Sequence, residues 1–553
     1  MSQSFLQIME ESVKRNWELP ALTDYKGTTF QYKEIARKIA KLHILFEAAG
    51  IRKGDKIALI GRNSSNWAVV FIATLSYGAV VVPILHEFKP ENVHHIVNHS
   101  EARLLFTGDA IWENLNPSSM IRINAIYSVD SFDLLYTTNE NNRQVFEHLN
   151  QKFGEKYPKS FGQNDLVFHK DEPDELALIS YTSGTTSHSK GVMLPYRTLW
   201  SNWMFANEVL PSITQQSNVV SLLPMAHMYG MAFEFLYEFG KGAHIHFLTR
   251  NPSPKVIFEA FQEIRPDIII AVPLIIEKIY RKQIQPIIER PAIKAMLKLP
   301  VLDTTITDKV RSTLVEAFGG KFIEVIIGGA AFNRETEDFF KRMKFPYTVG
   351  YGMTECGPII SYAPWASHAV HSCGKAAPRM EIKIDSASPS EIPGEILVKG
   401  TNVMLGYYKN EAATRAVFTE DGWMKTGDMG ILDAEGNLFI KGRCKTMILG
   451  ASGQNIYPEE IEDQINTMNM VSESLVIEAS GKLEALVYPD FETADRNGLS
   501  LADLEIIMEQ NRVAVNAVLP AYSQISRIRI MTEEFEKTPK RSIKRFLYQA
   551  TKE

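Results

Sequence analysis

The sequence has few cysteines: three in 553 residues, Cys356, Cys373 and Cys444, with no paired spacing among them. This scarcity argues against a disulfide framework or a zinc site, and it favours a reducing, cytoplasmic environment. Basic residues are not in excess either, because the formal net charge is −6. The chain therefore lacks the basic field typical of nucleic-acid-binding proteins, and we expect no nucleic-acid partner.

Targeting signals and long apolar runs are also scarce. Residues 1–10 lack the basic start and apolar core of a signal peptide. Residues 68–85 carry no charge, but Ser76-Tyr77-Gly78 and Pro83 interrupt them. This pattern predicts a buried helix followed by a buried strand and no transmembrane segment. Peripheral contact with a membrane and the oligomeric state both stay open.

The composition is that of a globular enzyme, with 45% hydrophobic and 22% charged residues. A chain of this length is too long for one core, so two or more domains are expected. The N-terminal part alternates helical and strand patterns: a helix over 30–50, a strand over 56–60, a helix over 66–76 and a strand over 80–83. This alternation predicts an α/β fold with a mainly parallel sheet.

The alternation of strands and helices resumes further along the chain. Apolar strands are predicted at 219–223, 268–272 and 322–327, and each is followed by a loop of small or polar residues. In open α/β sheets, ligands lie at the carboxyl ends of the strands. We therefore expect the loops at 182–191, 224–230, 328–332 and 350–357 to converge on one crevice.

The pattern of predicted secondary structure changes at about residue 380. Short strands at 381–384, 394–399 and 438–441 predict a small β subdomain. A compact α+β unit follows, in which Pro458 opens a helix and Glu459 and Glu460 lie near that helix's positive end.

One stretch, Tyr181-Thr-Ser-Gly-Thr-Thr-Ser-His-Ser-Lys-Gly-Val192, combines hydroxyls, glycines and a lysine between two apolar strands. Glycines allow several backbone N–H groups to point at one anion, and the hydroxyls and the lysine add further donors. The stretch therefore suits a phosphate cradle, although the Walker spacing is absent. An ordinary polar hairpin loop is built from the same residue types, so the stretch alone leaves both interpretations open.

Three further clusters carry chemistry. Residues 347–355 offer an aromatic ring, a hydroxyl and the carboxylate of Glu355, and Mg²⁺ is commonly bound by one or two carboxylates plus substrate phosphates. Residues 423–428 place Asp428 in a tight turn, where it could accept ribose hydroxyls. Residues 442–445 lie at the change of composition and have the pattern of a linker. Each cluster alone is also typical of ordinary turns and packing.

The order of these motifs is more specific than any one of them. The set YTSGTTSHSKGV, LPMAHMYG, GGAAF, GYGMTE, WMKTGD, GRCK and GQNIYPEEIE resembles the adenylate-forming superfamily of acyl-CoA synthetases, adenylation domains and luciferases. Within it, the chain looks most like bacterial long-chain fatty-acid CoA ligases. The resemblance implies that a fatty acid reacts with Mg²⁺-ATP to give acyl-AMP and pyrophosphate, and that CoA then displaces AMP to give acyl-CoA.

The resemblance also implies a domain scheme. It predicts a large N-terminal α/β domain over 1–442, including the β subdomain at about 380–442. A hinge over 443–447 would carry Lys445, about which a mobile α+β C-terminal domain over 448–553 rotates between the two half-reactions.

Site residues follow from the same resemblance. Those expected to bind the nucleotide are Thr182, Ser183, Gly184, Thr185, Thr186, Lys190, Gly329, Ala330, Ala331, Tyr351, Gly352, Met353, Thr354, Asp428 and Arg443. Tyr351 would stack on adenine, and Asp428 would hold the ribose with help from Arg443. Glu355 would bind Mg²⁺, and His227 would lie at the acyl and adenylate site. Thr182, Lys190, His227 and Glu355 are the expected catalytic residues of the large domain.

Two departures from the family pattern stand out. The phosphate loop has Ser187-His188-Ser189 where the family usually has Gly-x-Pro. In the C-terminal tail, Ser542 occupies the position of the family's adenylation lysine. Lys540 or Lys544 could take that role, and Lys540 is favoured because Lys544 lies close to the start of a helix. These basic residues could instead form a solvated face that touches CoA phosphates.

Other functions stay open. An acyl-AMP or acyl-carrier-protein ligase would share every motif, and the Ser542 substitution would suit a weakly catalytic adenylate-binding homologue. An amino-acid adenylation module is disfavoured, because such modules usually lead into a carrier domain and this sequence ends at Glu553. Acyl chain length cannot be read from any residue.

Overall fold

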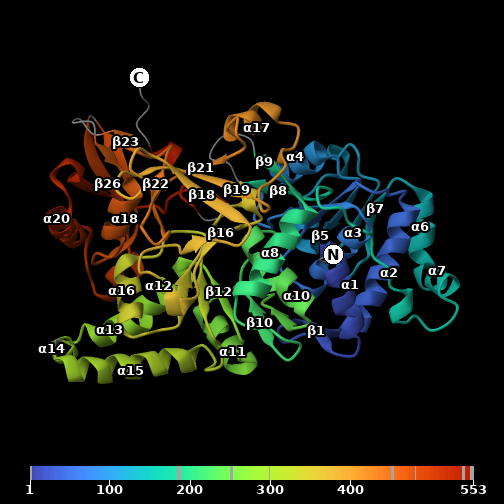
Figure 1. Ribbon diagram of the computed structural model, residues 1–553, viewed down its shortest axis with the longest axis horizontal. Helices are drawn as coiled ribbons and strands as arrows, with labels where there is room; N and C mark the ends of the chain where they lie inside the picture. The colour runs from blue at the N-terminus through green and yellow to red at the C-terminus, as the bar shows by residue number, and fades with distance from the viewer. Residues whose placement is uncertain are drawn as a thin grey trace.

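The computed structural model describes residues 3–182, 189–249, 253–297, 299–449, 454–479, 481–538 and 542–548. Figure 1 shows a large body of sheets and covering helices, with a smaller part formed by the C-terminal residues at the left of the view. The first elements in the chain are α1 (Phe5–Arg15), β1 (Pro20–Asp24), β2 (Thr29–Gln31), α2 (Tyr32–Ala48), β3 (Lys56–Ile60), α3 (Ser65–Ser76), β4 (Val80–Ile84), α4 (Pro90–Ser100), β5 (Leu104–Thr107), α5 (Asp109–Trp112), β6 (Ala125–Ser128), β7 (Leu134–Thr137), α6 (Glu140–Glu147) and α7 (Leu149–Lys156).

The main sheet of the described residues has the strand order β20-β9-β8-β4-β3-β5-β6-β7, where β8 (Leu176–Thr182), β9 (Lys190–Pro195) and β20 (Gly406–Tyr407) come from later in the chain. Strands β8, β4, β3, β5 and β6 run parallel, whereas β9, β20 and β7 pair antiparallel. All of β4 is buried, as continuous apolar strands in parallel sheets usually are. The predicted α/β fold with a mainly parallel sheet is confirmed.

The uncharged run at 68–85 forms the buried helix α3 and the buried strand β4, as predicted. No helix in the described ranges has both the length and the apolar content that a bilayer span requires.

Among the described residues, the middle of the chain builds three further sheets, with strand orders β10-β11-β1-β2, β12-β13-β14 and β15-β16-β17. Strands β12, β13 and β14 run parallel, so their carboxyl ends lie along one edge. The elements here are α8 (Tyr196–Val209), β10 (Asn218–Ser221), α9 (Met228–Met231), η3 (Ala232–Leu236), α10 (Tyr237–Lys241), β11 (His244–Phe247), α11 (Pro254–Ile264), β12 (Ile269–Ala271), α12 (Pro273–Ile279), η4 (Tyr280–Ile284), α13 (Gln285–Ile288), α14 (Pro291–Met296), α15 (Pro300–Ala317), β13 (Val325–Ile327), α16 (Arg334–Arg342), β14 (Tyr347–Val349), β15 (Tyr351–Gly352), η5 (Thr354–Cys356), β16 (Ile359–Tyr362) and β17 (Lys375–Ala376).

The predicted β subdomain is an antiparallel sheet, β18-β19-β21-β22, formed by β18 (Met380–Asp385), β19 (Gly394–Gly400), β21 (Met424–Leu432) and β22 (Leu438–Arg443). The linker interpretation of Gly442 and Arg443 was wrong. Both residues belong to β22, where the Arg443 backbone pairs with that of Asp428 on β21.

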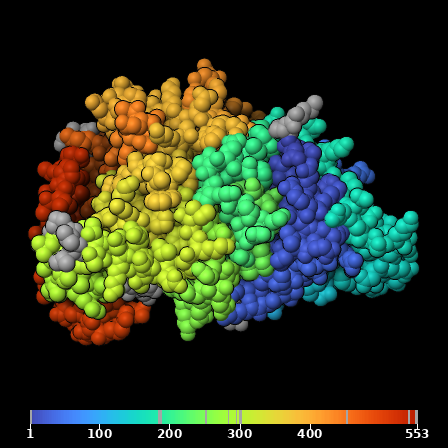
Figure 2. Space-filling model, turned by 60° about the horizontal axis from the view of Figure 1, so that its bottom comes forward, coloured from blue at the N-terminus to red at the C-terminus, as the bar shows by residue number. Residues whose placement is uncertain are grey.

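The C-terminal part has its own apolar core, which includes Ile461, Ile465, Val476 and Val515. Figure 2 shows the C-terminal residues in direct contact with the surface formed by the middle part of the chain. Its elements are β23 (Ile448–Leu449), β24 (Asn455–Ile456), α18 (Pro458–Asn466), β25 (Val471–Ala479), β26 (Lys482–Pro489), α19 (Phe491–Arg496), α20 (Leu501–Val518), β27 (Ile525–Ile530) and η8 (Arg545–Leu547). The order β25-β26-β27 with two packed helices is the predicted α+β unit. The exact domain boundaries at 442 and 447 remain a prediction.

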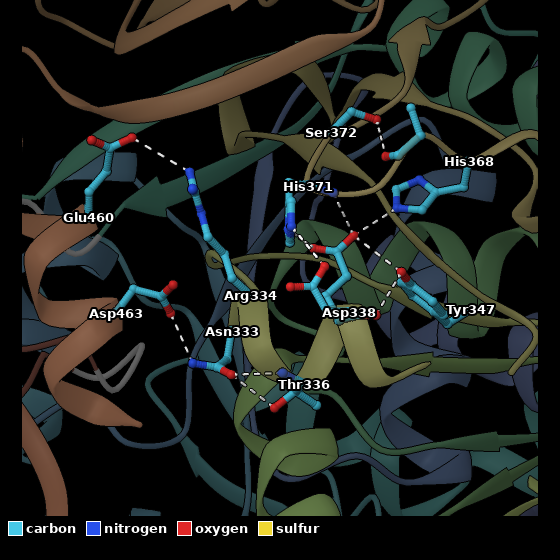
Figure 3. Close-up of polar contacts among 12 residues, drawn as sticks. Asn333, Arg334, Thr336, Asp338, Tyr347, His368, His371, Ser372, Glu460 and Asp463 are labelled. Carbon is cyan, nitrogen blue, oxygen red and sulfur yellow. Dashed lines mark hydrogen bonds and ion pairs between the residues drawn. The ribbon is translucent and has the colours of Figure 1, made fainter. Parts of the chain in front are cut away.

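Helix α16 is anchored to the large body by one buried carboxylate, Glu337. Its oxygens accept hydrogen bonds from Nε2 of His368 at 3.0 Å, from the backbone N–H of His371 at 2.9 Å and from the Tyr347 hydroxyl at 3.3 Å (Figure 3). Burial opposes ionisation, but the hydrogen bonds from His368 and His371 outweigh it and hold the pKa of Glu337 at about 2. The hydrogen bond to Glu337 in turn raises the pKa of His371.

We predict that Glu337→Gln lowers the unfolding free energy of the large body by about 3 kcal/mol, because the substitution breaks a buried charged network. Urea unfolding followed by tryptophan fluorescence measures this change, since all seven tryptophans precede residue 424. The contribution of Glu337 to the unfolding free energy is present above its ordinary pKa of 4.5 and is lost as pH falls towards 2. The contribution of His371 is present below its ordinary pKa of 6.5 and is lost as pH rises above that value. The deficit should therefore be largest between pH 4.5 and 6.5.

The neighbouring Asp338→Asn is a matched control, since the Asp338 side chain is 64% exposed and that of Glu337 is 3% exposed. The control should cost less than about 1 kcal/mol. Equal stability of the two variants would contradict the anchoring role of Glu337.

Candidate active site

The carboxyl ends of β13 and β14 carry two of the predicted ligand loops side by side. The backbone N–H of Gly350, after β14, donates to the carbonyl of Ile327 at the end of β13, at 2.9 Å. Gly329 has φ = +87°, a left-handed conformation that favours glycine. The segments 328–331 and 350–355 therefore start from one edge of one parallel sheet, where ligands of such sheets bind.

The loop that carries His227 packs against the first of these segments. The Tyr229 hydroxyl donates to the carbonyl of Ile326 at 3.0 Å, and a Cβ atom at Gly328 would lie 3.1 Å from the Tyr229 ring. Nδ1 of His227 accepts the backbone N–H of Tyr229 at 3.3 Å, so His227 caps the start of α9. Tyr229 thus joins the His227 loop to the Gly328–Ala331 loop.

Asp428 is the meeting point of the second segment and the β subdomain. The Tyr351 hydroxyl donates to Oδ2 of Asp428 at 2.6 Å, and Nε of Arg443 lies 3.4 Å from Oδ1. Burial raises the pKa of Asp428, whereas Arg443 and the Tyr351 hydroxyl oppose the rise. The Arg443 side chain is 69% exposed, so it lies at the rim of this group.

A second chain of contacts reaches the phosphate-loop strands. The Tyr407 hydroxyl donates to Oε1 of Glu355 at 2.9 Å, and the Lys190 ammonium lies 4.6 Å from the centroid of the Tyr407 ring. Lys190 on β9 is the register partner of Thr182 at the end of β8. Two chains of contacts therefore meet at residues 351–355: one joins Thr182, Lys190 and Tyr407 to Glu355, and the other joins Tyr351 to Asp428.

Comparison with known proteins identifies the family of this cluster. A family profile described as AMP-binding enzyme matches residues 9–408. The chain belongs to the AMP-binding enzyme family.

Individual relatives are similar in sequence. The chain is 25% identical over 481 residues to a long-chain fatty-acid–CoA ligase of Mus musculus, covering 81% of this chain and 64% of that protein. It therefore spans less than two thirds of that relative. A long-chain fatty-acid–CoA ligase of Mycobacterium bovis is 25% identical over 569 residues, which cover 95% of this chain and 91% of that ligase.

Among solved structures, o-succinylbenzoate CoA synthetase from Bacillus subtilis, in complex with ATP and a magnesium ion, is similar with a TM-score of 0.73 and 20% identity. The match covers 98% of this chain and 99% of the synthetase. The predicted superfamily and its fold, a large N-terminal α/β domain followed by an α+β region, are confirmed.

Seven of the fifteen predicted nucleotide residues lie in the two segments at the sheet edge, and Thr182, Lys190, Asp428 and Arg443 lie in strands. Ala330, Ala331, Gly352, Met353 and Thr354 belong to the two segments at the sheet edge. Ser183, Gly184, Thr185, Thr186 and Lys540 lie outside the described residues. Lys445 is exposed in the turn that follows β22. The roles assigned to all of these residues stay predictions.

Lys544 does not join the cluster among the contacts of the described residues. Its ammonium forms an ion pair with Glu536 of the same tail, and its backbone N–H donates to the Glu536 carbonyl at 2.8 Å. It lies directly before the short helix η8, close to where the sequence placed a helix start. The backbone N–H of Thr538 donates to the carbonyl of Ser542 at 2.8 Å, and Lys537 and Ile543 form an antiparallel bridge.

Sequence reasoning missed three buried residues around the cluster. Tyr229 and Tyr407 make contacts that no local motif signals, and Glu234 fixes the start of the His227 loop. Glu234 lies in η3, and its carboxylate accepts the backbone N–H groups of Leu222 at 3.1 Å and Leu223 at 2.8 Å. Burial raises the pKa of Glu234 to about 8, and these hydrogen bonds oppose the rise only in part. A charged residue within an apolar helix was the one signal available.

We predict that Glu234→Gln weakens the pH dependence of stability. Since the folded-state pKa of about 8 lies above the ordinary 4.5, the folded protein holds a proton that the unfolded chain loses, and stability falls as pH rises between these values. Glutamine has no such proton. Between pH 6 and pH 8 the variant should lose about 2 kcal/mol less unfolding free energy than wild type.

Urea denaturation at the two pH values measures this difference. Glu411→Gln serves as the control, because the Glu411 side chain is 88% exposed, and it should follow the wild-type pH dependence. A Glu234→Gln profile parallel to wild type would show that Glu234 is ionised throughout.

Proposed function

We propose that the protein activates a carboxylic acid with ATP and transfers the acyl group to a thiol, with a long-chain fatty acid and CoA as the first candidates. The observation that carries this proposal is that two chains of contacts meet at residues 351–355: Thr182 and Lys190 are joined to Glu355 through Tyr407, and Tyr351 is joined to Asp428. Membership of the AMP-binding enzyme family supports it, and the similarity to the mouse and mycobacterial long-chain fatty-acid–CoA ligases favours a fatty acid.

The nucleoside end of ATP is assigned to the Asp428 side of the cluster. The Asp428 carboxylate is partly desolvated and already accepts one hydroxyl, so it suits the hydroxyls of a ribose, and Arg443 stands beside it. The left-handed Gly329 brings backbone close to the adenine side, where Ala330 and Ala331 leave room for a flat ring. The ring of Tyr351, a residue that is 8% exposed, would pack against the opposite face of the adenine.

The phosphates are assigned to the Lys190 side. Thr182 and Lys190 flank the loop that contains Ser183, Gly184, Thr185 and Thr186, and these donors suit the β- and γ-phosphates. Glu355 suits Mg²⁺, since its side chain lies at the other end of the Lys190–Tyr407 contact. When bound, Mg²⁺ supplies charge neutralisation at the phosphate oxygens.

Two displacements complete the reaction. A carboxylate oxygen attacks the α-phosphorus while the bond to pyrophosphate breaks, so no general base is needed for this step. The thiolate of CoA then attacks the acyl carbonyl carbon, and AMP leaves with the electron pair of the broken C–O bond. Fixed donors such as Lys190 stabilise the charge that builds on the phosphoryl oxygens. His227, held by Tyr229, is assigned to the acyl side.

The adenylation lysine is assigned to Lys540. Lys544 forms an ion pair with Glu536, so it would have to leave this partner to reach a substrate. Lys540 itself lies outside the described residues, and no partner is assigned to it. An acyl-AMP or acyl-carrier-protein ligase is the second candidate, and it differs only in the thiol.

A panel of carboxylates tests the proposal. We predict ATP–pyrophosphate exchange with long-chain saturated acids, and acyl-CoA formation when CoA is added. Short-chain, aryl and amino acids should support exchange at least tenfold more slowly, because transfer of each methylene to an apolar site contributes about 0.8 kcal/mol.

The same panel decides between the candidates. Exchange with long-chain acids and thioester formation only on carrier-protein pantetheine would move the assignment to the carrier-protein ligase. Exchange confined to short or aryl acids would overturn the long-chain assignment. AMP binding without exchange for any acid would favour a non-catalytic adenylate-binding protein.

A further inference from the structure

A histidine of α4 contacts the first residue of the stretch that carries the phosphate loop. Nδ1 of His99, in the last turn of α4, lies 2.7 Å from the hydroxyl of Tyr181 on β8. Tyr181 is 4% exposed, and it belongs to the apolar core that includes Val97 of α4 and Ile179 of β8. A hydroxyl at this depth is costly without a hydrogen bond, and His99 provides one. The contact therefore links α4 to the strand end that carries Thr182.

The charge states of the two side chains set the direction of this hydrogen bond. Burial raises the pKa of the Tyr181 hydroxyl, so Tyr181 keeps its proton. Burial lowers the pKa of His99, His95 and Lys409 lower it further, and Glu101 opposes the change only in part. His99 is therefore neutral at pH 7. With its own proton on Nε2, it accepts the Tyr181 O–H at Nδ1.

Tyr181 also fixes the strand that returns from the phosphate loop. Gly191, directly after Lys190 on β9, is the register partner of Tyr181. A Cβ atom at Gly191 would lie 3.1 Å from the Tyr181 ring, so the ring occupies the space that the glycine leaves. Thr182 and Lys190 are the next register pair. Both predicted phosphate donors thus stand beside a strand position that His99 helps to hold.

The end of α4 is itself held in place, so the imidazole of His99 has a fixed position. The backbone N–H of Tyr408 donates to the Gly191 carbonyl at 2.7 Å, and its hydroxyl donates to Oε2 of Glu101 at 3.2 Å. The Lys409 ammonium donates to the His99 carbonyl at 3.2 Å and forms an ion pair with Glu101 at 3.1 Å. Glu101 is the C-terminal cap of α4. An acceptor held by such neighbours is pre-organised.

We propose that His99 is a positioning residue for the phosphate loop, because through Tyr181 it holds the strand ends from which Thr182 and Lys190 reach the phosphates of ATP. The inference rests on the proposed function, which assigns these two residues to the phosphates. His99 acts through Tyr181 and does not touch the nucleotide. Loss of its hydrogen bond weakens ATP binding and slows adenylation, whereas the second half-reaction, which follows the departure of pyrophosphate, changes little.

His99→Leu and His99→Asn form the first test. Leucine removes the acceptor, so the Tyr181 hydroxyl turns to another partner and ATP binding has to reverse that displacement. The Oδ1 atom of asparagine takes the place of Nδ1 and still accepts the hydroxyl. The Kd of Mg²⁺-ATP, measured by calorimetry without a carboxylate, should rise about tenfold in His99→Leu and stay within about threefold of wild type in His99→Asn. Equal Kd values for the two variants would overturn the proposal.

Tyr181→Phe removes the same hydrogen bond from the other side and should also raise the Kd of Mg²⁺-ATP. His99→Leu/Tyr181→Phe should raise it no further than the larger of the two single effects, because no buried polar group is then left without a partner. Additive increases would overturn the proposal. Tyr181→Phe decides the question by the same Kd should His99→Leu not fold.

His94→Leu is the matched control. His94 lies on the same helix, and its Nε2 accepts the backbone N–H of Asn116, in the loop before β6, at 3.0 Å. The variant loses one histidine acceptor of α4 and should leave the Kd of Mg²⁺-ATP within about twofold of wild type. A rise equal to that of His99→Leu would show that any loosening of α4 weakens ATP binding, and His99 would then have no specific role.

The pH dependence of ATP binding is a readout that a merely structural role would not move. Because the pKa of His99 lies below the ordinary 6.5, protonation removes the acceptor only as pH falls below that value. Asparagine does not titrate. The ratio of the wild-type Kd to that of His99→Asn should therefore be constant above pH 6.5 and rise below it, and the titration of ATP and of His95 cancels in this ratio. A ratio that stays constant until the protein unfolds would contradict the proposal.

Binding and exchange together separate this inference from the proposed function. If wild type shows no ATP–pyrophosphate exchange with any carboxylate, but the Kd of Mg²⁺-ATP rises in His99→Leu and not in His99→Asn, the function fails and the positioning role stands. If wild type exchanges and His99→Leu binds ATP as wild type does, His99 has no such role and the function stands.

Discussion

The hydrogen bond from Tyr351 to Asp428 is the contact on which the rest of the site depends. It joins β15, which directly follows the parallel sheet β12-β13-β14 in the chain, to the antiparallel sheet of the β subdomain, across 77 residues of sequence. A carboxylate at this depth is costly without donors, and Tyr351 and Arg443 supply them. Arg443 ends the last strand before the C-terminal part. The Asp428 carboxylate therefore lies where the loops at the sheet edge, the β subdomain and the start of the C-terminal part come together.

Around this junction the structure uses long side chains from distant elements to hold short functional loops. Tyr407 connects Glu355 to Lys190, and Tyr229 connects the His227 loop to Gly328. Hydroxyl groups at the tips of buried rings satisfy polar partners while the rings fill apolar space, which makes such contacts rigid. Rigid placement matters for a reaction whose transition state is stabilised by fixed donors rather than by a general base.

Much of the fold and the local motifs could be predicted from sequence because they depend on neighbours in the chain. The helix and strand at 68–85 follow from a local apolar pattern, and the family follows from motifs in order. Tyr407, Tyr229 and Glu234 could not be found in this way, since their partners lie 52, 97 and up to 13 residues away and leave no spacing signal. Arg443 was misread as a linker because a strand end and a linker share the same small and charged residues. The contact between Asn333 and Asp463 joins two separate cores, and no periodicity of either segment encodes it.

The most direct test of the account is to trap the reaction intermediate. The protein is mixed with a long-chain fatty acid and ATP labelled at the α-phosphate, without any thiol, and is then separated from free nucleotide. The account predicts a stoichiometric amount of label held on the protein as acyl-AMP, with pyrophosphate released, and discharge of the label as AMP when CoA is added. Formation of ADP, or retention of unreacted ATP with every carboxylate tried, would contradict it.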